Sequence, residues 1–239
     1  MRWFGLILLG VVAFSGSNQE ISYESPKINP WDVKAPILWD EFATGAINSS
    51  GNIGQLGWTV AGTHGTAQVA NRPGIATVTA GATAFADLHV PNAFVVAISN
   101  VSVVKGIAAW ATGANQPDSR FGIVSTNTGA EPADDAVYFE RNATEADWFA
   151  VTRDGAGANM TRTDTNVAFV AGNYYALEIR HPSSGQWNFY INDNLVASRS
   201  SGNIPAEATF IGPMFQIETN GTGLAMSVDY FFMQLATTR

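Results

Sequence analysis

Short runs of β-branched and aromatic residues recur from Leu38 to Leu235, and each run is broken by Gly, Asn, Asp, Ser or Pro. The apolar residues of this range do not keep the period of about 3.6 residues that an amphipathic helix requires. Strands that are this numerous and evenly spaced bury their apolar faces only against a second sheet or in a closed barrel. The sequence therefore predicts an all-β fold, a two-sheet antiparallel β-sandwich.

Period-two alternation places the individual strands. Tyr175, Leu177 and Ile179 alternate with Glu178 and Arg180, which is the pattern of a strand with one buried face. The predicted strands are residues 38–43, 57–60, 67–69, 75–79, 84–89, 94–98, 107–112, 120–125, 136–141, 148–152, 159–163, 174–180, 186–191, 195–199, 210–219 and 224–235.

The end of the chain predicts a hairpin and a central strand. Asp193-Asn194 is expected to form a two-residue turn, because Asn and Asp tolerate positive φ. The strand at residues 224–235 has apolar residues on both faces late in its length, which favours a central position in its sheet. One face of this strand is expected to carry Met226, Val228, Tyr230 and Phe232.

Composition excludes several classes of function. Hydrophobic residues make up 46% of the chain and charged residues only 13%, so the chain has enough apolar surface for a core and too little charge for disorder. A net charge of −8 argues against nucleic acid as a partner, because phosphate contacts need clustered Lys and Arg. The absence of cysteine excludes disulfides, thiolate metal sites and cysteine nucleophiles.

Residues 1–17 form an apolar N-terminal segment with two open interpretations. A basic Arg2, an apolar run and then Ser15-Gly16-Ser17 match a secretory signal peptide. The apolar run is shorter than the roughly 20 residues that span a bilayer, so we expect no membrane span. The alternative is an arm that is retained in the mature protein and buried by a partner subunit.

Residues 18–37 are predicted to be an extended arm or linker, and residues 38–239 to be the β-sandwich domain. Prolines interrupt the first of these ranges, and its apolar residues recur without a period. If the arm docks on neighbouring subunits, its large apolar side chains are the expected anchors. These are Trp3, Phe4, Leu8, Ile28 and Trp31.

Two stretches carry a resemblance to known families. Residues 174–180, followed by 186–197, look like the strand, turn and strand unit of concanavalin A-like (laminin-G-like) jelly rolls, in which a strand ending in a basic residue precedes an FYIDG-x-LVA hairpin. This chain has Asn194 where that family usually has Gly. Near the other end, Asp40-Glu41-Phe42, residues 51–58 and residues 71–75 resemble lectin-like structural proteins of tailed bacteriophages.

The resemblance implies a virion component, in a tail or decorating a capsid, with other virion subunits as partners and a homo-oligomeric state. A glycan is a further possible partner of such a protein. The alternative is a secreted carbohydrate-binding module from which a signal peptide has been cleaved. The expected location is accordingly the virion, with the extracellular space as the alternative.

Catalytic signatures are missing from the sequence. Glycosidases and lyases with this fold use paired carboxylates on one strand, and their Glu-x-Asp-x-x-Glu pattern does not occur here. The nearest candidates are Glu140 with Glu145 and Asp87 beside His89, each of which is interpreted as a solvated strand or loop residue. The sequence has no Gly-x-Ser-x-Gly elbow and no phosphate loop. We therefore predict that the protein is not an enzyme.

Binding residues are predicted for calcium and for glycan. Asp134, Asp135 and Asp193 offer the hard oxygen ligands that calcium takes, although Asp residues also populate turns for reasons of their own. We expect no cofactor, with calcium at these residues as the alternative. Sugar binding needs an exposed aromatic platform, for which Tyr138, Trp110 and Trp148 are the candidates; in strands, however, Trp more often belongs to a core.

Overall fold

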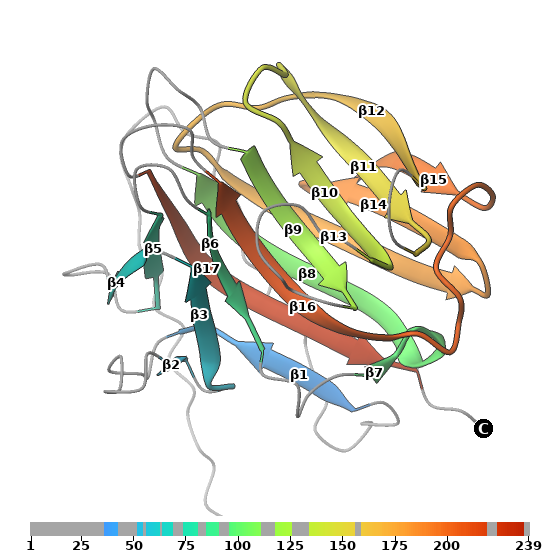
Figure 1. The fold of residues 1–239 in the computed structure, drawn as a ribbon, viewed down its shortest axis with the longest axis horizontal. Helices are drawn as coiled ribbons and strands as arrows, with labels where there is room; N and C mark the ends of the chain where they lie inside the picture. The colour runs from blue at the N-terminus through green and yellow to red at the C-terminus, as the bar shows by residue number, and fades with distance from the viewer. Residues whose placement is uncertain are drawn as a thin grey trace, which may run out of the picture. The chain divides into compact units, whose positions relative to one another are not determined.

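A computed structural model describes residues 36–42, 52–54, 56–62, 64–68, 74–80, 85–90, 96–110, 118–125, 134–155, 159–218 and 224–236. Two antiparallel sheets lie face to face (Figure 1), which confirms the predicted two-sheet sandwich. Helical structure within these ranges is confined to one 3₁₀ turn, Ile98–Asn100. None of the helical structure in the described ranges is long and apolar enough to cross a membrane.

The first sheet, sheet A, has eight strands. In spatial order it contains β15 (Asn194–Arg199), β14 (Gln186–Ile191), β13 (Tyr174–Ser183), β8 (Val101–Trp110), β17 (Ala225–Leu235), β5 (Ala76–Ala80) and β4 (His64–Gln68), with β1 (Ile37–Asp40) also paired to β17. The final strand, β17, is therefore central, as its two apolar faces predict.

The second sheet, sheet B, has nine strands and holds the functional candidates. Its order is β12 (Met160–Ala168), β11 (Asp147–Arg153), β10 (Ala136–Arg141), β9 (Asp118–Val124), β16 (Phe210–Glu218), β6 (Phe85–His89), β3 (Trp58–Gly62) and β2 (Asn52–Ile53), with β7 (Val96–Ala97) also paired to β16. The strands β9, β10 and β16 stand at its centre.

Aromatic side chains from both sheets fill the space between them. Trp110 of sheet A meets Trp148 of sheet B edge-on, with ring centroids 5.1 Å apart. Phe139 and Phe189 form a second inter-sheet pair at 5.3 Å. Such pairs contribute about 0.5–1.5 kcal/mol each beyond the burial of their area. Edge-to-face contacts of this kind help to set the spacing of the two layers.

The predicted strands correspond to observed ones, with differences in their ends. The largest difference is in β8, which begins at Val101 rather than at residue 107. Gly106 lies in the middle of β8. Glycine is depleted in strands, but this glycine faces the core. A Cβ at this position would lie 2.5 Å from a ring carbon of Phe121 and 2.7 Å from one of Phe215. Glycine is thus required by packing within the strand and does not mark its end.

Two local predictions are corrected. The register of β17 shifts between Val228 and Tyr230, so Met226 and Val228 face the core while Tyr230 and Phe232 face outward. The bulge inserts one residue and reverses the alternation. The hairpin turn consists of Asn192-Asp193, one residue earlier than predicted, and both residues have positive φ.

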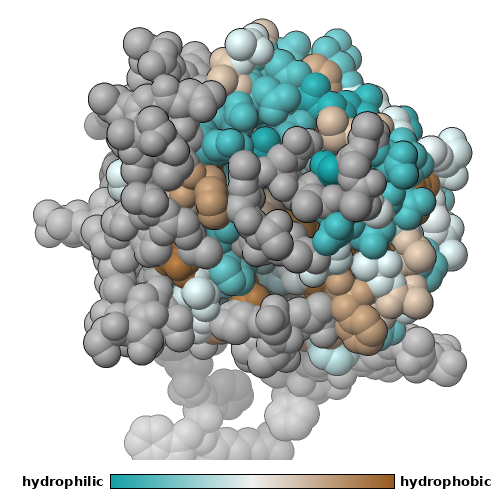
Figure 2. Space-filling view, in the orientation of Figure 1, coloured by the Kyte–Doolittle hydropathy of each residue, from teal (hydrophilic) through white to brown (hydrophobic). Residues whose placement is uncertain are grey.

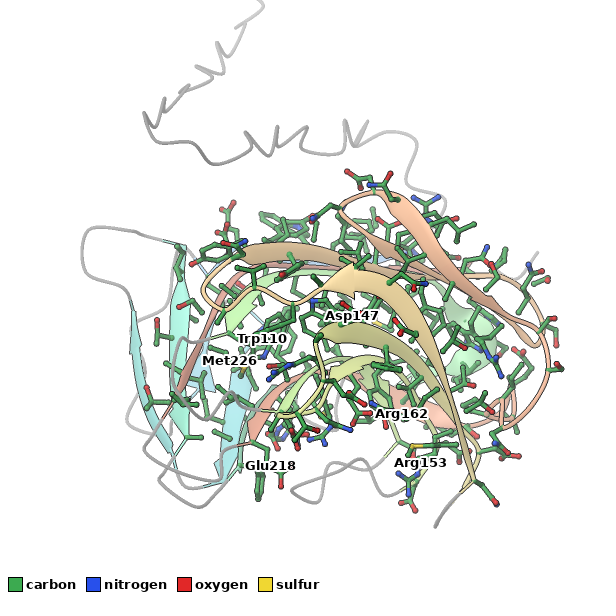
Figure 3. All side chains as sticks on the ribbon, turned by 90° about the horizontal axis from the view of Figure 1, so that it is seen from above. Trp110, Asp147, Arg153, Arg162, Glu218 and Met226 are labelled. Carbon is green, nitrogen blue, oxygen red and sulfur yellow. The ribbon has the colours of Figure 1, made fainter. Side chains whose placement is uncertain are left out.

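Sheet B is curved, and the face turned away from sheet A lies on the hollow side of the curve (Figure 3). We call this the outer face of sheet B. Because side chains alternate along a strand, a strand that buries Phe121 and Ile123 in the core presents Arg120 and Gly122 here. Figure 2 views the molecule from this side and shows hydrophilic residues gathered over β10 to β12.

Candidate functional site

A cluster of charged side chains occupies the outer face of sheet B at its centre. Arg120 of β9 lies between carboxylates of three strands: its Nε is 3.0 Å from Glu140 of β10, and its Nη1 is 3.0 Å from Glu218 of β16. Its Nη2 is 3.7 Å from Asp118, two residues earlier on β9 itself. The strand register sets this arrangement, because Glu140, Arg120 and Gln216 are direct cross-strand partners.

Arg162 of β12 extends the cluster towards the edge of the sheet. Its Nε lies 2.9 Å from the second carboxylate oxygen of Glu140, and its Nη2 lies 2.7 Å from Glu145. The guanidinium also stacks over the ring of Phe149 at 4.3 Å from its centroid. Glu145 belongs to the β10–β11 turn, where it also accepts a hydrogen bond from the backbone N–H of Asn142.

Ion pairing shifts the pKa values of Arg120 and Glu145. Burial by itself would lower the pKa of Arg120, but the charge of Glu140 and the hydrogen bonds to Glu218 and Glu140 raise that pKa above its ordinary value. Burial by itself would raise the pKa of Glu145. The hydrogen bonds from Arg162 and from the Asn142 N–H outweigh it, so the pKa of Glu145 lies below its ordinary value. Ion pairing therefore favours the charged forms of Arg120 and Glu145.

The lowered pKa of Glu145 predicts a loss of stability in acid. The folded protein binds a proton at Glu145 less readily than the unfolded chain, whose pKa is about the ordinary value of 4.5. The contribution to stability is therefore complete above pH 4.5 and declines as the pH falls through the lower folded-state pKa. Urea unfolding at a series of pH values measures this, and Glu145→Gln is expected to flatten the profile below pH 4.5. An unchanged profile in that variant would contradict the assignment.

Glu140 is a structural member of the cluster. Its side chain is nearly fully buried, and each of its carboxylate oxygens lies within 3.0 Å of a guanidinium nitrogen. The sequence-based interpretation of Glu140 as a solvated strand residue is therefore wrong. Because Glu140 is buried and a guanidinium group contacts each of its carboxylate oxygens, it is not accessible to a substrate, and we do not assign it an acid or base role.

Asp118 and Glu218 are the accessible carboxylates of the cluster. They are direct cross-strand partners at the ends of β9 and β16, and their side chains are 20% and 24% exposed. Residues paired in this way have Cβ atoms about 4.5–5.5 Å apart on the same face. Like charges so close repel each other, and the positive Arg120 that contacts both offsets the repulsion. Glu218 and Arg162 both lie on the side of sheet B that faces away from sheet A (Figure 3).

Asp87 and His89 form a second polar group on the same face. Both are on β6, and Asp87 pairs in register with Gln216, the neighbour of Arg120. The Nδ1 atom of His89 lies 2.7 Å from Oδ1 of Asp87. The Asp87 side chain is fully buried, which corrects its interpretation as a solvated residue.

The residues predicted to contact glycan are buried. Trp110 and Trp148 belong to the core between the sheets, where the Nε1 of Trp110 donates to the carbonyl of Gln216 at 3.1 Å. Tyr138 lies on the outer face of sheet B but is completely buried in a small apolar cluster with Val151 and Met214. These rings do not offer an exposed platform in this structure.

The predicted calcium ligands belong to two separate loops, with Asp134 and Asp135 before β10 and Asp193 in the β14–β15 turn. Asp135 accepts a hydrogen bond from the N–H of Gly155, and Asp193 accepts one from the Nζ of Lys105 on sheet A. Asp134 precedes Asp135 in the segment before β10. Among the residues that the structure describes, no three His, Cys, Asp or Glu side chains gather as a metal site. Calcium binding stays a prediction. The proposed docking anchors, Trp3, Phe4, Leu8, Ile28 and Trp31, lie outside the described residues.

Sequence reasoning missed Asp118, Arg120, Arg162 and Glu218. The available signal was charge within apolar strands: Arg120 precedes Phe-Gly-Ile-Val, and Glu218 follows a run of buried residues. A charge in such a position is costly unless it is paired, so each predicts a partner on the same face. The identity of those partners depends on the register between strands far apart in the sequence.

Comparison with known proteins establishes the fold. No protein-family model matches the chain, and no curated protein sequence matches it either. Among solved structures, the laminarinase of Rhodothermus marinus is 10% identical with a TM-score of 0.62, covering 85% of this chain and all (100%) of that one. A glycoside hydrolase family 16 endo-glucanase of Bacteroides ovatus is 8% identical with a TM-score of 0.60, and the match covers 82% of this chain and 99% of the endo-glucanase. A carbohydrate esterase of the Shiga toxin-encoding bacteriophage phi24B is 16% identical with a TM-score of 0.51, and the match covers 85% of this chain and 100% of the esterase.

These similarities confirm the concanavalin A-like jelly roll and correct the predicted function. Several solved structures that share the fold are carbohydrate-cleaving enzymes, and this finding contradicts the predictions of a non-enzymatic virion component and of no enzyme. The prediction of no enzyme relied on a missing one-strand motif. Two strands that pair in register can bring carboxylates together just as well, as Asp118 and Glu218 show.

Proposed function

We propose that the protein is a carbohydrate-active enzyme that holds a glycan on the outer face of sheet B and hydrolyses a glycosidic bond with Asp118 and Glu218. The observation that carries the proposal is the pairing of these two partly exposed carboxylates across the central strands β9 and β16. The fold supports it, because solved structures with the same architecture include laminarinases and endo-glucanases. Their substrates, β-linked glucans, are accordingly the first to test.

The expected chemistry is hydrolysis with retention. Retaining glycosidases place two carboxyl groups about 5–5.5 Å apart, the range that direct cross-strand partners allow. One carboxyl group protonates the glycosidic oxygen while the other attacks the anomeric carbon, and the leaving sugar departs with the proton. Water then cleaves the glycosyl ester, which releases the second sugar and restores both groups. Arg120, which contacts both carboxylates, positions them through its guanidinium.

Release of reducing sugar from laminarin and from mixed-linkage β-glucan tests the proposal. Asp118→Asn and Glu218→Gln are each expected to lower kcat about 10²–10⁴-fold, the usual contribution of a catalytic acid or base. Asp154→Asn, an exposed position after β11, serves as the matched control and should leave the rate unchanged. An inactive wild-type protein, or variants as active as the control, would refute the assignment.

Location and further partners stay predictions. An extracellular protein is what residues 1–17 predict if they are a signal peptide, and that location suits an enzyme that acts on polysaccharide. The homo-oligomer expected from the sequence is not required by the proposed chemistry, because Asp118, Glu218 and Arg120 all come from one chain.

A further inference from the structure

The outer face of β6 carries an unusual trio of side chains. Ala86 and Leu88 of this strand belong to the core, so the alternation presents Phe85, Asp87 and His89 on the outer face of sheet B. Phe85 and His89 are partly exposed, while Asp87 between them is fully buried. A partly exposed aromatic ring and a partly exposed imidazole thus flank a buried carboxylate.

Asp87 fixes the orientation and the tautomer of His89. Because the Asp87 carboxylate accepts a hydrogen bond, the His89 Nδ1 at 2.7 Å must be the donor. In the neutral ring the Nε2 atom is then an acceptor. The His89 side chain is 23% exposed, so a ligand on this face can approach it.

Stability alone does not explain this pair. The second carboxylate oxygen of Asp87, Oδ2, is buried and has no hydrogen-bond partner within the described part of the chain. An unsatisfied buried acceptor destabilises the folded state, and a charged one does so more strongly. Local costs of this kind are expected at functional positions, where a binding requirement offsets them.

The trio continues the carboxylate site. Phe85 is the direct cross-strand partner of Glu218. His89 is four residues further along β6, which at roughly 3.4 Å per residue places it about 13–14 Å from the Glu218 level. A ligand that contacts both Glu218 and His89 must therefore be an oligosaccharide and not a single sugar.

We propose that the outer face of β6 is a binding subsite for the same glycan chain and extends away from the bond that is cleaved. The ring of Phe85 stacks on a sugar next to Glu218, and the Nε2 of His89, oriented by Asp87, accepts a hydrogen bond from a sugar hydroxyl further along. This inference rests on the proposed function. It adds a preference for long glycan chains over short ones, and it assigns Asp87 the role of orienting the His89 ring.

Calorimetric binding in a Glu218→Gln background tests the subsite without cleavage. The probes are a β-1,3-linked glucose hexasaccharide and the corresponding disaccharide. Phe85→Leu keeps the apolar volume and removes the ring face, and His89→Leu removes the acceptor. Each is expected to weaken hexasaccharide binding about 2- to 10-fold, the effect of one net hydrogen bond or similar contact. His89→Leu, which lies further from Glu218, is expected to leave disaccharide binding unchanged. Asn188→Ala, on sheet A, is the control.

A spectroscopic measurement separates binding from a purely structural role. Nitrogen NMR of the His89 ring is expected to show a protonated Nδ1, and the Nε2 resonance should shift when the hexasaccharide is added. Asp87→Leu should release this tautomer and weaken hexasaccharide binding as His89→Leu does. Variants that lose thermal stability but bind the hexasaccharide as tightly as the control would overturn the subsite, and so would equal wild-type affinity for the two probes. If Asp118→Asn remains hydrolytically active while the β6 variants lose affinity, the catalytic proposal fails and the subsite stands.

Discussion

Replacing Arg120 with methionine is expected to lower the free energy of unfolding by about 3–5 kcal/mol. Its guanidinium is nearly fully buried and contacts the carboxylates of Glu140, Glu218 and Asp118. Removing one partner of a buried ion pair leaves an uncompensated charge in a medium that solvates it poorly. Glu140 is as buried as Arg120, so the oxygen that Arg120 contacts cannot turn to water, and Arg162 compensates only the other oxygen. Urea unfolding followed by tryptophan fluorescence measures the loss.

The matched control is Arg180→Met on sheet A. Arg180 also pairs with a carboxylate, that of Glu178, and stacks on Tyr190, but its side chain is 46% exposed. Exposed ion pairs contribute only about 0–1 kcal/mol, so this variant should remain close to the wild type. A second test adds Glu140→Gln to Arg120→Met, which should recover part of the lost stability by removing the buried charge. Equal effects of Arg120→Met and Arg180→Met would show that the cluster does not organise sheet B.

Replacing Gly122 with alanine is expected to destabilise the fold by about 3 kcal/mol or more, at the upper end of overpacking effects. Gly122 of β9 lies directly opposite Tyr138 of β10. A Cβ here would be 2.5 Å from the Cα of Tyr138 and would also clash with the carbonyl oxygen of Val137. These are backbone atoms of the neighbouring central strand, so relief requires the two strands to separate. Urea unfolding monitored by circular dichroism measures the effect.

Gly106→Ala provides the comparison for this prediction. The added Cβ would meet ring atoms of Phe121 and Phe215, which can rotate slightly, instead of backbone. We expect a smaller loss, about 1–3 kcal/mol. Because β9 and β10 carry Arg120 and Glu140, Gly122→Ala should also disturb the charged cluster and reduce any hydrolytic activity. A larger loss of stability in Gly106→Ala than in Gly122→Ala would contradict this account of strand spacing.

The fold was predictable because its signal is local. Alternation in residues such as Tyr175, Leu177 and Ile179 reports burial of one strand face, whatever that face packs against. Local signals failed where tertiary packing decides the outcome. Gly106 lies within β8 because the rings of Phe121 and Phe215 leave no room for a side chain at this position. The bulge in β17 turns Tyr230 outward and Phe231 into the core.

The candidate site was less predictable because its residues meet only through register. Arg120 and Glu218 are 98 positions apart, and nothing near either residue specifies the other. Glu140 and Asp87 were noticed from sequence, but their burial was not. A carboxylate on a strand is interpreted as solvated until its partner is known, which is Arg120 or Arg162 for Glu140 and His89 for Asp87. This difficulty is general, because charged residues are mostly exposed, and a single sequence does not distinguish a buried, paired charge from a surface one.

A crystal structure of Glu218→Gln with the β-1,3-linked hexasaccharide would show directly where the glycan binds. We expect sugar density on the outer face of sheet B, with a glycosidic oxygen or anomeric carbon within about 3–3.5 Å of Asp118 and the chain continuing over β6 towards His89. Sugar bound to the outer face of sheet A, or density on sheet B that avoids Asp118 and residue 218, would contradict this expectation.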